Sequence, residues 1–194
     1  MSAVLDVSRP TPLRLFGFLF TAVGGLLIAL GAISDWATVV FLGGAFPDSA
    51  AKGIDVPEGK VALALGIFML VAIVAMRLTD SLAARRTIAL LVTVSALVAL
   101  AIGVVDIVRA QDRFGGYTVD QTAKQIAEES GQPLDKVRAD VQGVIDRGAS
   151  IDLGLGIWLV VAGGVIGTIG GVLDLAWVDQ RRLAAPNADI AAAE

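Results

Sequence analysis

The amino-acid sequence predicts an all-α integral membrane protein: a bundle of four transmembrane helices, with an extracytoplasmic helical hairpin between the third and the fourth. The first observation behind this class is composition. Of the 194 residues, 56% are hydrophobic and 18% are charged, whereas soluble domains are about 45–50% apolar and about 25% charged. The second observation is that four apolar stretches approach the roughly 20 residues needed to cross a hydrocarbon core about 30 Å thick.

The four predicted spans cover residues 13–34, 61–78, 87–108 and 153–178. Because a segment in lipid must satisfy its backbone polar groups internally, each span is expected to be a helix. The first span could instead be a cleaved signal peptide, since Ala32-Ile33-Ser34 is a small-x-small pattern. Its apolar run is longer than the about 7–15 residues of a signal-peptide core, which favours a retained helix.

Arginines in the short connections predict the orientation. Arg77, Arg85 and Arg86 lie between the second and third spans, and Arg181 and Arg182 follow the fourth. Because cytoplasmic loops are enriched in Lys and Arg, we expect a multi-pass plasma-membrane protein with both termini in the cytoplasm. Residues 1–12 then form a cytoplasmic N-terminus, and segments 35–60 and 109–152 are outer loops of the membrane domain 13–180. The Ala- and Asp-rich tail, 181–194, is expected to be cytoplasmic and disordered.

An internal repeat is indicated by the second and fourth spans. Residues 63–72 and 153–162 share Leu, Leu-Gly-Ile and Val-Ala at matching positions. Repeats of this kind are common in transport folds, and the pattern favours two parallel hairpins, each made of a span, an outer segment and a returning span. The alternative is that apolar helices resemble one another by composition.

Glycines in the fourth span recur at helical spacing. They stand four or seven residues apart: Gly156, Gly163, Gly167, Gly170 and Gly171. Small residues at such spacing let helix backbones approach closely inside a membrane. The favoured interpretation is packing within the four-helix bundle, and the alternative is docking onto helices of another membrane protein.

The second outer loop predicts a helical hairpin. Thr118 and Gln121 form a capping-box pattern that predicts a helix start, Gly131 predicts its end, and Pro133 predicts a second helix that continues to about residue 147. This second helix carries an apolar stripe at helical spacing: Leu134, Val137, Val141, Val144 and Ile145. The stripe needs a cover, which is the other helix, the first outer loop or a partner. The first two are favoured, because connected helices usually pack on each other.

The first outer loop gives a weaker signal. Residues 35–42, which begin with Asp35 and Trp36, are typical of an interfacial anchor that continues into an extended piece.

Missing residue types exclude much chemistry. The chain has no cysteine and no histidine, which removes disulfides, thiolate catalysis, His-ligated haem, most zinc sites and Ser-His triads. Asp106 and Asp174 come near the ends of spans, whereas ion transporters keep charges at mid-membrane. We therefore expect no enzymatic activity, no cofactor and no metal. The net charge of −4 also argues against nucleic acid as a partner.

Residues 24–36, residues 59–66 and the Arg-Arg connection that follows resemble, in this order, a broad group of small actinobacterial four-transmembrane-helix envelope proteins. That group has no agreed activity, so the resemblance implies an actinobacterial plasma membrane. The expected role is a non-enzymatic accessory or scaffolding subunit of a larger cell-envelope complex, such as a lipid-import ABC-type, respiratory or cell-wall assembly. Its partners would be other integral membrane proteins and membrane lipids. The alternative is a small transporter or a lipid-binding membrane carrier.

Overall fold

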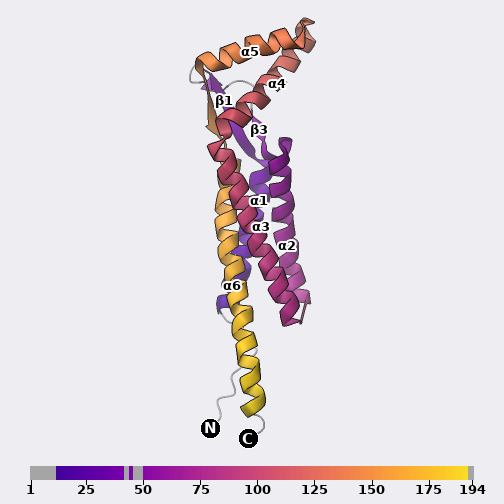
Figure 1. The fold of residues 1–194 in the computed structure, drawn as a ribbon, viewed down its shortest axis with the longest axis vertical. Coiled ribbons are helices and arrows are strands. Elements are labelled where there is room, and N and C mark those ends of the chain that lie inside the picture. Colours follow the sequence, from indigo (N-terminus) through magenta and orange to yellow (C-terminus); the bar gives the residue numbers. More distant parts are fainter. Residues whose placement is uncertain (1–11, 42–43, 46–49, 192–194) are drawn as a thin grey trace.

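The computed structural model describes residues 12–41, 44–45 and 50–191 of the chain. Four long helices run side by side along its main axis: α1 (Pro12–Ile33), α2 (Pro57–Leu78), α3 (Leu82–Val108) and α6 (Leu155–Ala191) (Figure 1). All four are long and apolar enough to cross a membrane, α6 over its part Leu155–Arg181. The predicted four-helix membrane bundle is thereby confirmed as a fold.

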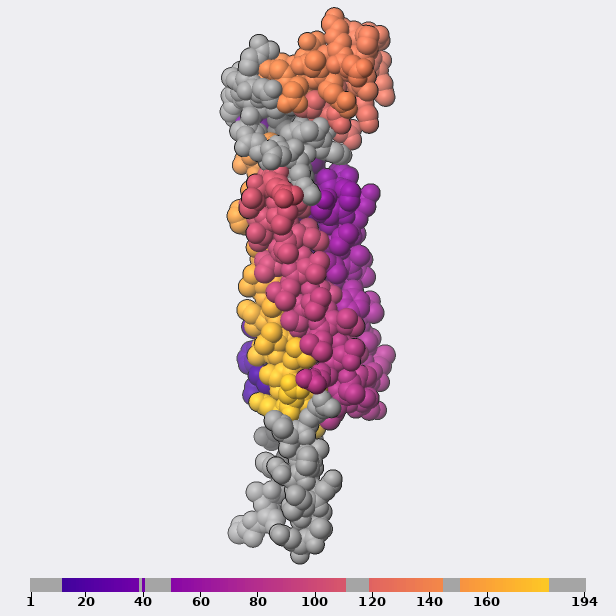
Figure 2. All heavy atoms as spheres, in the orientation of Figure 1, coloured from indigo at the N-terminus to yellow at the C-terminus, as the bar shows by residue number. Residues whose placement is uncertain are grey.

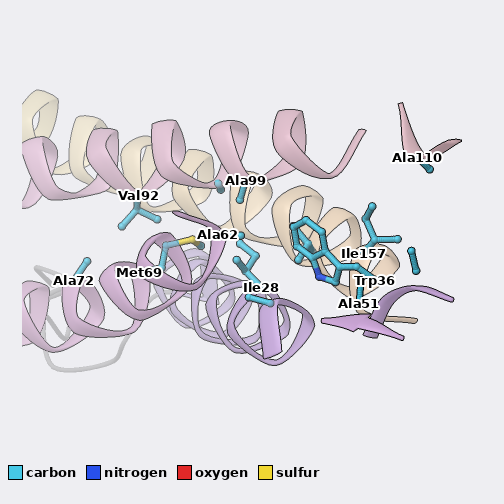
Figure 3. Packing of buried hydrophobic residues seen from close by; sticks show 14 residues of the cluster. Ile28, Trp36, Ala51, Ala62, Met69, Ala72, Val92, Ala99, Ala110 and Ile157 are labelled. Atoms are coloured by element: carbon cyan, nitrogen blue, oxygen red, sulfur yellow. The ribbon is translucent and has the colours of Figure 1, made fainter. Parts of the chain in front are cut away.

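The helices form a ring in the order α1, α2, α3, α6. α6 packs against both α1 and α3, and α2 also contacts these two helices. The centre of the ring holds a few large side chains such as Ile28, Met69 and Val92, with many alanines around them (Figure 3). Large apolar side chains elsewhere on the same helices are exposed, as expected where lipid covers the outside of the bundle.

A small sheet covers one end of the bundle. Its central strand is β1 (Asp35–Phe41), which pairs antiparallel with β2 (Gly44–Ala45), β3 (Ala51–Lys52) and β4 (Ala149–Leu153). The register with β4 runs from Ala37 opposite Leu153 to Phe41 opposite Ala149. The extended piece predicted after Asp35 is therefore a strand, and the sheet joins the segment between α1 and α2 to the segment between α3 and α6.

Trp36 fixes this sheet to the bundle. Its side chain is fully buried, and its indole Nε1 donates a hydrogen bond to the carbonyl oxygen of Gly31 at 2.8 Å. The backbone N–H of Gly154, just before α6, donates to the carbonyl of Trp36, also at 2.8 Å. The end of α1 and the beginning of α6 are thus connected through one strand, and we expect the sheet to move with the bundle as one unit.

The helical hairpin stands at the same end, beyond the sheet. It consists of α4 (Ala110–Ser130) and α5 (Leu134–Gly148), and it forms the end of an elongated molecule (Figures 1 and 2). The predicted stop at Gly131 is confirmed, because Gly131 adopts φ 66° and its N–H bonds the carbonyl of Ala127 at 2.9 Å. This left-handed conformation favours glycine.

The predicted helix start at Thr118 is wrong. α4 begins at Ala110, separated from α3 only by Arg109, whose backbone (φ −102°, ψ 12°) departs from helical geometry. The N–H of Arg109 still bonds the carbonyl of Val105 at 2.9 Å. Because Thr118 lies inside a helix that has already begun, its position needs no capping side chain.

The limits of the spans differ slightly from the predicted ones. α2 begins earlier, at Pro57. α3 also begins earlier, directly after its N-cap residue Ser81, whose hydroxyl accepts a hydrogen bond from the backbone N–H of Ala84. α6 begins two residues later than predicted, because the backbone up to Leu153 pairs with β1. At its other end α6 continues to Ala191, which differs from the predicted disorder of residues 181–194. Alanine is frequent in this segment and has the highest helix propensity; residues 192–194 lie outside the described part.

The predicted repeat is not reflected in the packing of its two matched glycines. A Cβ on Gly66 would lie 2.8 Å from the backbone nitrogen of Ala29, and one on Gly156 would lie 2.7 Å from the carbonyl oxygen of Gly31. Both matched segments therefore face α1, whereas two equivalent hairpins would set Gly156 against α3.

Candidate functional site

The glycines of α6 lie inside the bundle. A Cβ on Gly163 would lie 2.7 Å from the carbonyl oxygen of Gly24, and one on Gly170 would lie 2.5 Å from the backbone nitrogen of Thr21, so both face α1. Gly171 faces Thr93 of α3, Gly167 faces Met69 of α2 and Ala96 of α3, and Gly156 faces the end of α1. These five glycines accordingly serve the contacts of α6 with its three neighbours, and a partner would have to use another surface.

The apolar stripe of the outer hairpin is only partly covered. Val137 is 4% exposed, and Leu134 and Val141 are half-buried. Val119 and Ala123 of α4 are buried as well, which follows from the packing of α4 on α5. The side chain of the last member of the stripe, Ile145, lies outside the described ones.

Among the described side chains of the hairpin, two large apolar ones remain exposed to solvent. Val144 of α5 is 43% exposed and Ile126 of α4 is 40% exposed. Between the same two helices, Arg138 and Asp120 form an ion pair at 2.6 Å with half-exposed side chains, an arrangement that contributes at most about 1 kcal/mol. The hairpin is therefore held together by the buried side chains of Val119, Ala123 and Val137. Ile126 and Val144 are available to a partner.

A second region lies at the opposite end of the bundle, where α1 and α3 begin and α2 and the apolar part of α6 end. A partly enclosed hollow between the four helices is lined by Arg14, Phe18, Ile73, Met76, Arg77, Arg85, Asp174, Trp177 and Val178. We call it the arginine–tryptophan pocket. Its lining includes three arginines from three different helix ends, Arg14 of α1, Arg77 of α2 and Arg85 of α3, together with the aromatic side chains of Phe18 and Trp177.

Trp177 is the centre of this pocket and is 6% exposed. The guanidinium carbons of Arg14, Arg181 and Arg85 lie 5.0, 5.3 and 5.6 Å from the centre of its ring. A guanidinium within about 6 Å of an aromatic centre is attracted by the negative face of the ring. A fourth guanidinium, that of Arg77, lies 4.5 Å from the ring of Phe18.

Hydrogen bonds position two of the charged groups. Arg85, whose side chain is only 15% exposed, donates from Nε to the carbonyl oxygen of Thr79 at 2.7 Å. Asp174 is buried and accepts a hydrogen bond from the hydroxyl of Thr21 at 3.4 Å. The pocket thus contains one buried carboxylate and one largely buried guanidinium held by backbone.

In the sequence these arginines indicate the orientation of the spans, and no pattern singles out Trp177. One signal was available. Trp177 and Arg181 stand four residues apart on a helix, which places them on the same face, and the ends of four spans on one side of a membrane must lie at one level. Arg14 at the start of the first span belongs to that level by the same argument.

These features define a multi-pass membrane protein with four helices of transmembrane length, a sheet and a helical hairpin at one end, and a basic pocket at the opposite end. In comparison with known protein families and with curated proteins, the chain matches none. Among the described residues, no group of three or more acidic side chains is arranged to hold a metal ion.

Proposed function

We propose that the protein is a non-enzymatic accessory or scaffolding subunit of a larger membrane complex of the actinobacterial cell envelope. A lipid-import ABC-type, a respiratory or a cell-wall assembly are the candidate complexes. The observation that carries the proposal is that the hairpin α4–α5 stands beyond the bundle and is connected to it at both ends (Figure 1).

The hairpin is fixed at both of its ends. On one side α4 follows α3 after the single residue Arg109, and on the other side β4 follows α5 directly and pairs with β1. Isolated exposed apolar side chains are common on protein surfaces, so Ile126 and Val144 alone would mean little. Carried on a hairpin with two fixed ends, they offer a partner a surface that is already ordered, which reduces the entropy lost on binding.

A paired substitution tests this role of the hairpin. We expect Ile126→Glu combined with Val144→Glu to abolish co-purification of a membrane partner in mild detergent, because each carboxylate would enter the apolar part of the contact. The control is Gln125→Glu combined with Ala139→Glu, which adds the same charge at exposed positions of the same two helices. Mass spectrometry of the captured complexes provides the measurement.

If the variant Ile126→Glu/Val144→Glu still co-purifies with the partner, the proposed contact through the hairpin is contradicted. If the unaltered protein, labelled with a tag and solubilised gently, retains no other membrane protein in stoichiometric amount, the scaffolding function itself is wrong.

Both termini are proposed to lie in the cytoplasm. The proposal is supported by Arg14, Arg77, Arg85, Arg86 and Arg181, which belong to the end of the bundle opposite to the hairpin, since positive residues favour the cytoplasmic side. The hairpin would then lie on the extracytoplasmic side of the membrane.

Cysteine labelling tests the orientation. The chain contains no cysteine, so a single introduced thiol is the only target. We expect Ser130→Cys, at the tip of the hairpin, to react with an impermeant maleimide in intact cells, and Ser81→Cys, between α2 and α3, to react only after lysis. Reaction of Ser81→Cys in intact cells would reverse the orientation.

Lipid binding is the second candidate function, and the arginine–tryptophan pocket favours it. Transport has less support. The hydroxyls of Thr93 and Thr168, which lie inside spans, donate to the carbonyls of Ala89 and Gly164 on their own helices, at 2.9 and 2.7 Å. Hydroxyls satisfied in this way have no need of a substrate.

A further inference from the structure

We propose that the arginine–tryptophan pocket binds the phosphate group of an anionic ligand at the membrane surface, with the headgroup of a phospholipid as its source. The inference specifies the ligand of the second candidate function, lipid binding, and is independent of the hairpin and its partner.

The first argument is charge. Among the residues whose side chains the structure describes, this end of the bundle has more arginines (Arg14, Arg77, Arg85, Arg86, Arg181) than aspartates (Asp80, Asp174, Asp179), so it is positively charged. Arg86 pairs with Asp179 at 3.4 Å and Arg85 approaches Asp80 at 4.0 Å. Arg14, Arg77 and Arg181 then have one remaining carboxylate, Asp174, between them. The negative charge of a phospholipid phosphate would offset part of this positive charge.

The second argument is the state of the guanidinium groups. A guanidinium that covers an aromatic face donates its hydrogen bonds at its edges, because its N–H groups lie in its own plane. The guanidinium carbons of Arg14 and Arg85 lie over the ring of Trp177, at 5.0 and 5.6 Å from its centre, and Arg85 is also held through its Nε by the carbonyl oxygen of Thr79. A planar donor held in this way loses little freedom when it binds phosphate oxygens.

The third argument is depth in the membrane. Arg14 and Arg85 belong to the first turns of α1 and α3, and Arg77 belongs to the last turn of α2. Arg181 follows the apolar run of α6, after Asp179 and Gln180. Phospholipid phosphates lie at this boundary between hydrocarbon and water, and basic pockets between transmembrane helices bind anionic headgroups. A lipid beside the bundle could therefore place its phosphate in the pocket while its acyl chains cover the exposed apolar side chains below.

The experiment uses the purified full-length protein in a neutral detergent. Phosphatidylglycerol, phosphatidylcholine and inorganic phosphate are added separately at equal phosphate concentration, and bound ligand is counted by native mass spectrometry while the Tm is followed. We expect phosphatidylglycerol to bind and to raise the Tm of the unaltered protein. For the variant Arg14→Gln/Arg85→Gln we expect affinity lower by roughly tenfold or more, because two charge-assisted contacts are lost.

The control variant is Lys124→Gln/Arg138→Gln, which loses the same charge in the hairpin, at the other end of the molecule from the pocket; it should retain the affinity for phosphatidylglycerol. If phosphatidylglycerol alone raises the Tm, the ligand is a lipid headgroup. If inorganic phosphate raises the Tm as well, the pocket also binds phosphate from solution. Equal binding of phosphatidylglycerol and phosphatidylcholine, or unchanged binding by the pocket variant, would overturn the proposal and leave the arginines a packing role on Trp177.

A second variant covers the case in which the glutamine variant does not fold. Arg14→Lys/Arg85→Lys keeps both charges but lacks the planar fork, and it should bind phosphatidylglycerol more weakly than the unaltered protein and lose it at lower salt, since exposed charge pairs are screened by ions. Binding that is insensitive both to salt and to this exchange would equally refute a phosphate site.

Discussion

Replacing Gly24 by leucine is expected to lower the Tm of the purified protein by about 6–12 °C. A Cβ at this position would lie 2.6 Å from both the Cα and the backbone nitrogen of Gly167, and 2.8 Å from the carbonyl oxygen of Gly163. All three atoms belong to the backbone of α6, so no rotation of a side chain relieves the overlap. Forced overpacking of a well-packed core costs about 3 kcal/mol at the upper end of its usual range, and each kcal/mol lowers the Tm of a chain of this size by roughly 2–4 °C.

Thermal unfolding in detergent provides the measurement, with Ala162→Leu as the control. Ala162 is exposed on α6 next to Gly163, so the same side chain there should enter lipid or detergent and leave the Tm nearly unchanged. Gly167→Leu should be milder than Gly24→Leu, because the nearest atom to its Cβ is the end of the flexible Met69 side chain, at 2.5 Å. Equal Tm values for Gly24→Leu and Ala162→Leu would show that α1 and α6 are not in close contact.

The four spans could be predicted because lipid makes hydropathy decisive. Within hydrocarbon the backbone has no alternative to the helix, and α1, α2 and α3 end at or within one residue of the predicted limits. Their starting points were less certain, since Pro57 and Ser81 begin helices several residues before the apolar run does. Outside lipid, residues that favour the first turn of a helix, such as these two, decide where the helix begins. The hydropathy of the sequence does not show them.

The sheet could not be predicted in the same way. β2 and β3 have two residues each, too few for any periodicity, and β4 pairs with a strand from the other outer loop. Such pairing depends on where the bundle brings the ends of α1 and α6. The arginine–tryptophan pocket has the same origin, because each arginine taken singly is an ordinary interfacial residue, and only the ring of four helices brings them around Trp177.

The second large effect is expected in the outer hairpin. Val137→Asp combined with Val141→Asp should separate α5 from α4 while the four spans remain inserted. Full burial of a valine contributes roughly 1.5–3 kcal/mol, and a carboxylate at the place of Val137, which is 4% exposed, would be buried without a compensating charge. The remaining ion pair between Arg138 and Asp120 is too exposed to hold the two helices together.

Limited trypsin digestion of proteoliposomes measures this separation, because Lys124 and Lys136 lie on the two helices of the hairpin and are cleaved faster when the hairpin opens. Ala139→Asp combined with Val144→Asp is the control: it adds the same two charges to exposed positions of α5 and should leave digestion slow.

The two pairs of substitutions also distinguish two reasons for which a partner could be lost. If the hairpin must be folded to bind, Val137→Asp/Val141→Asp loses the partner through unfolding, whereas a variant at Val144 loses it with the hairpin intact. Should the opened hairpin still retain the partner, the contact must lie on the sheet or on the lipid-facing surface of the bundle, since the glycines of α6 are occupied within the bundle.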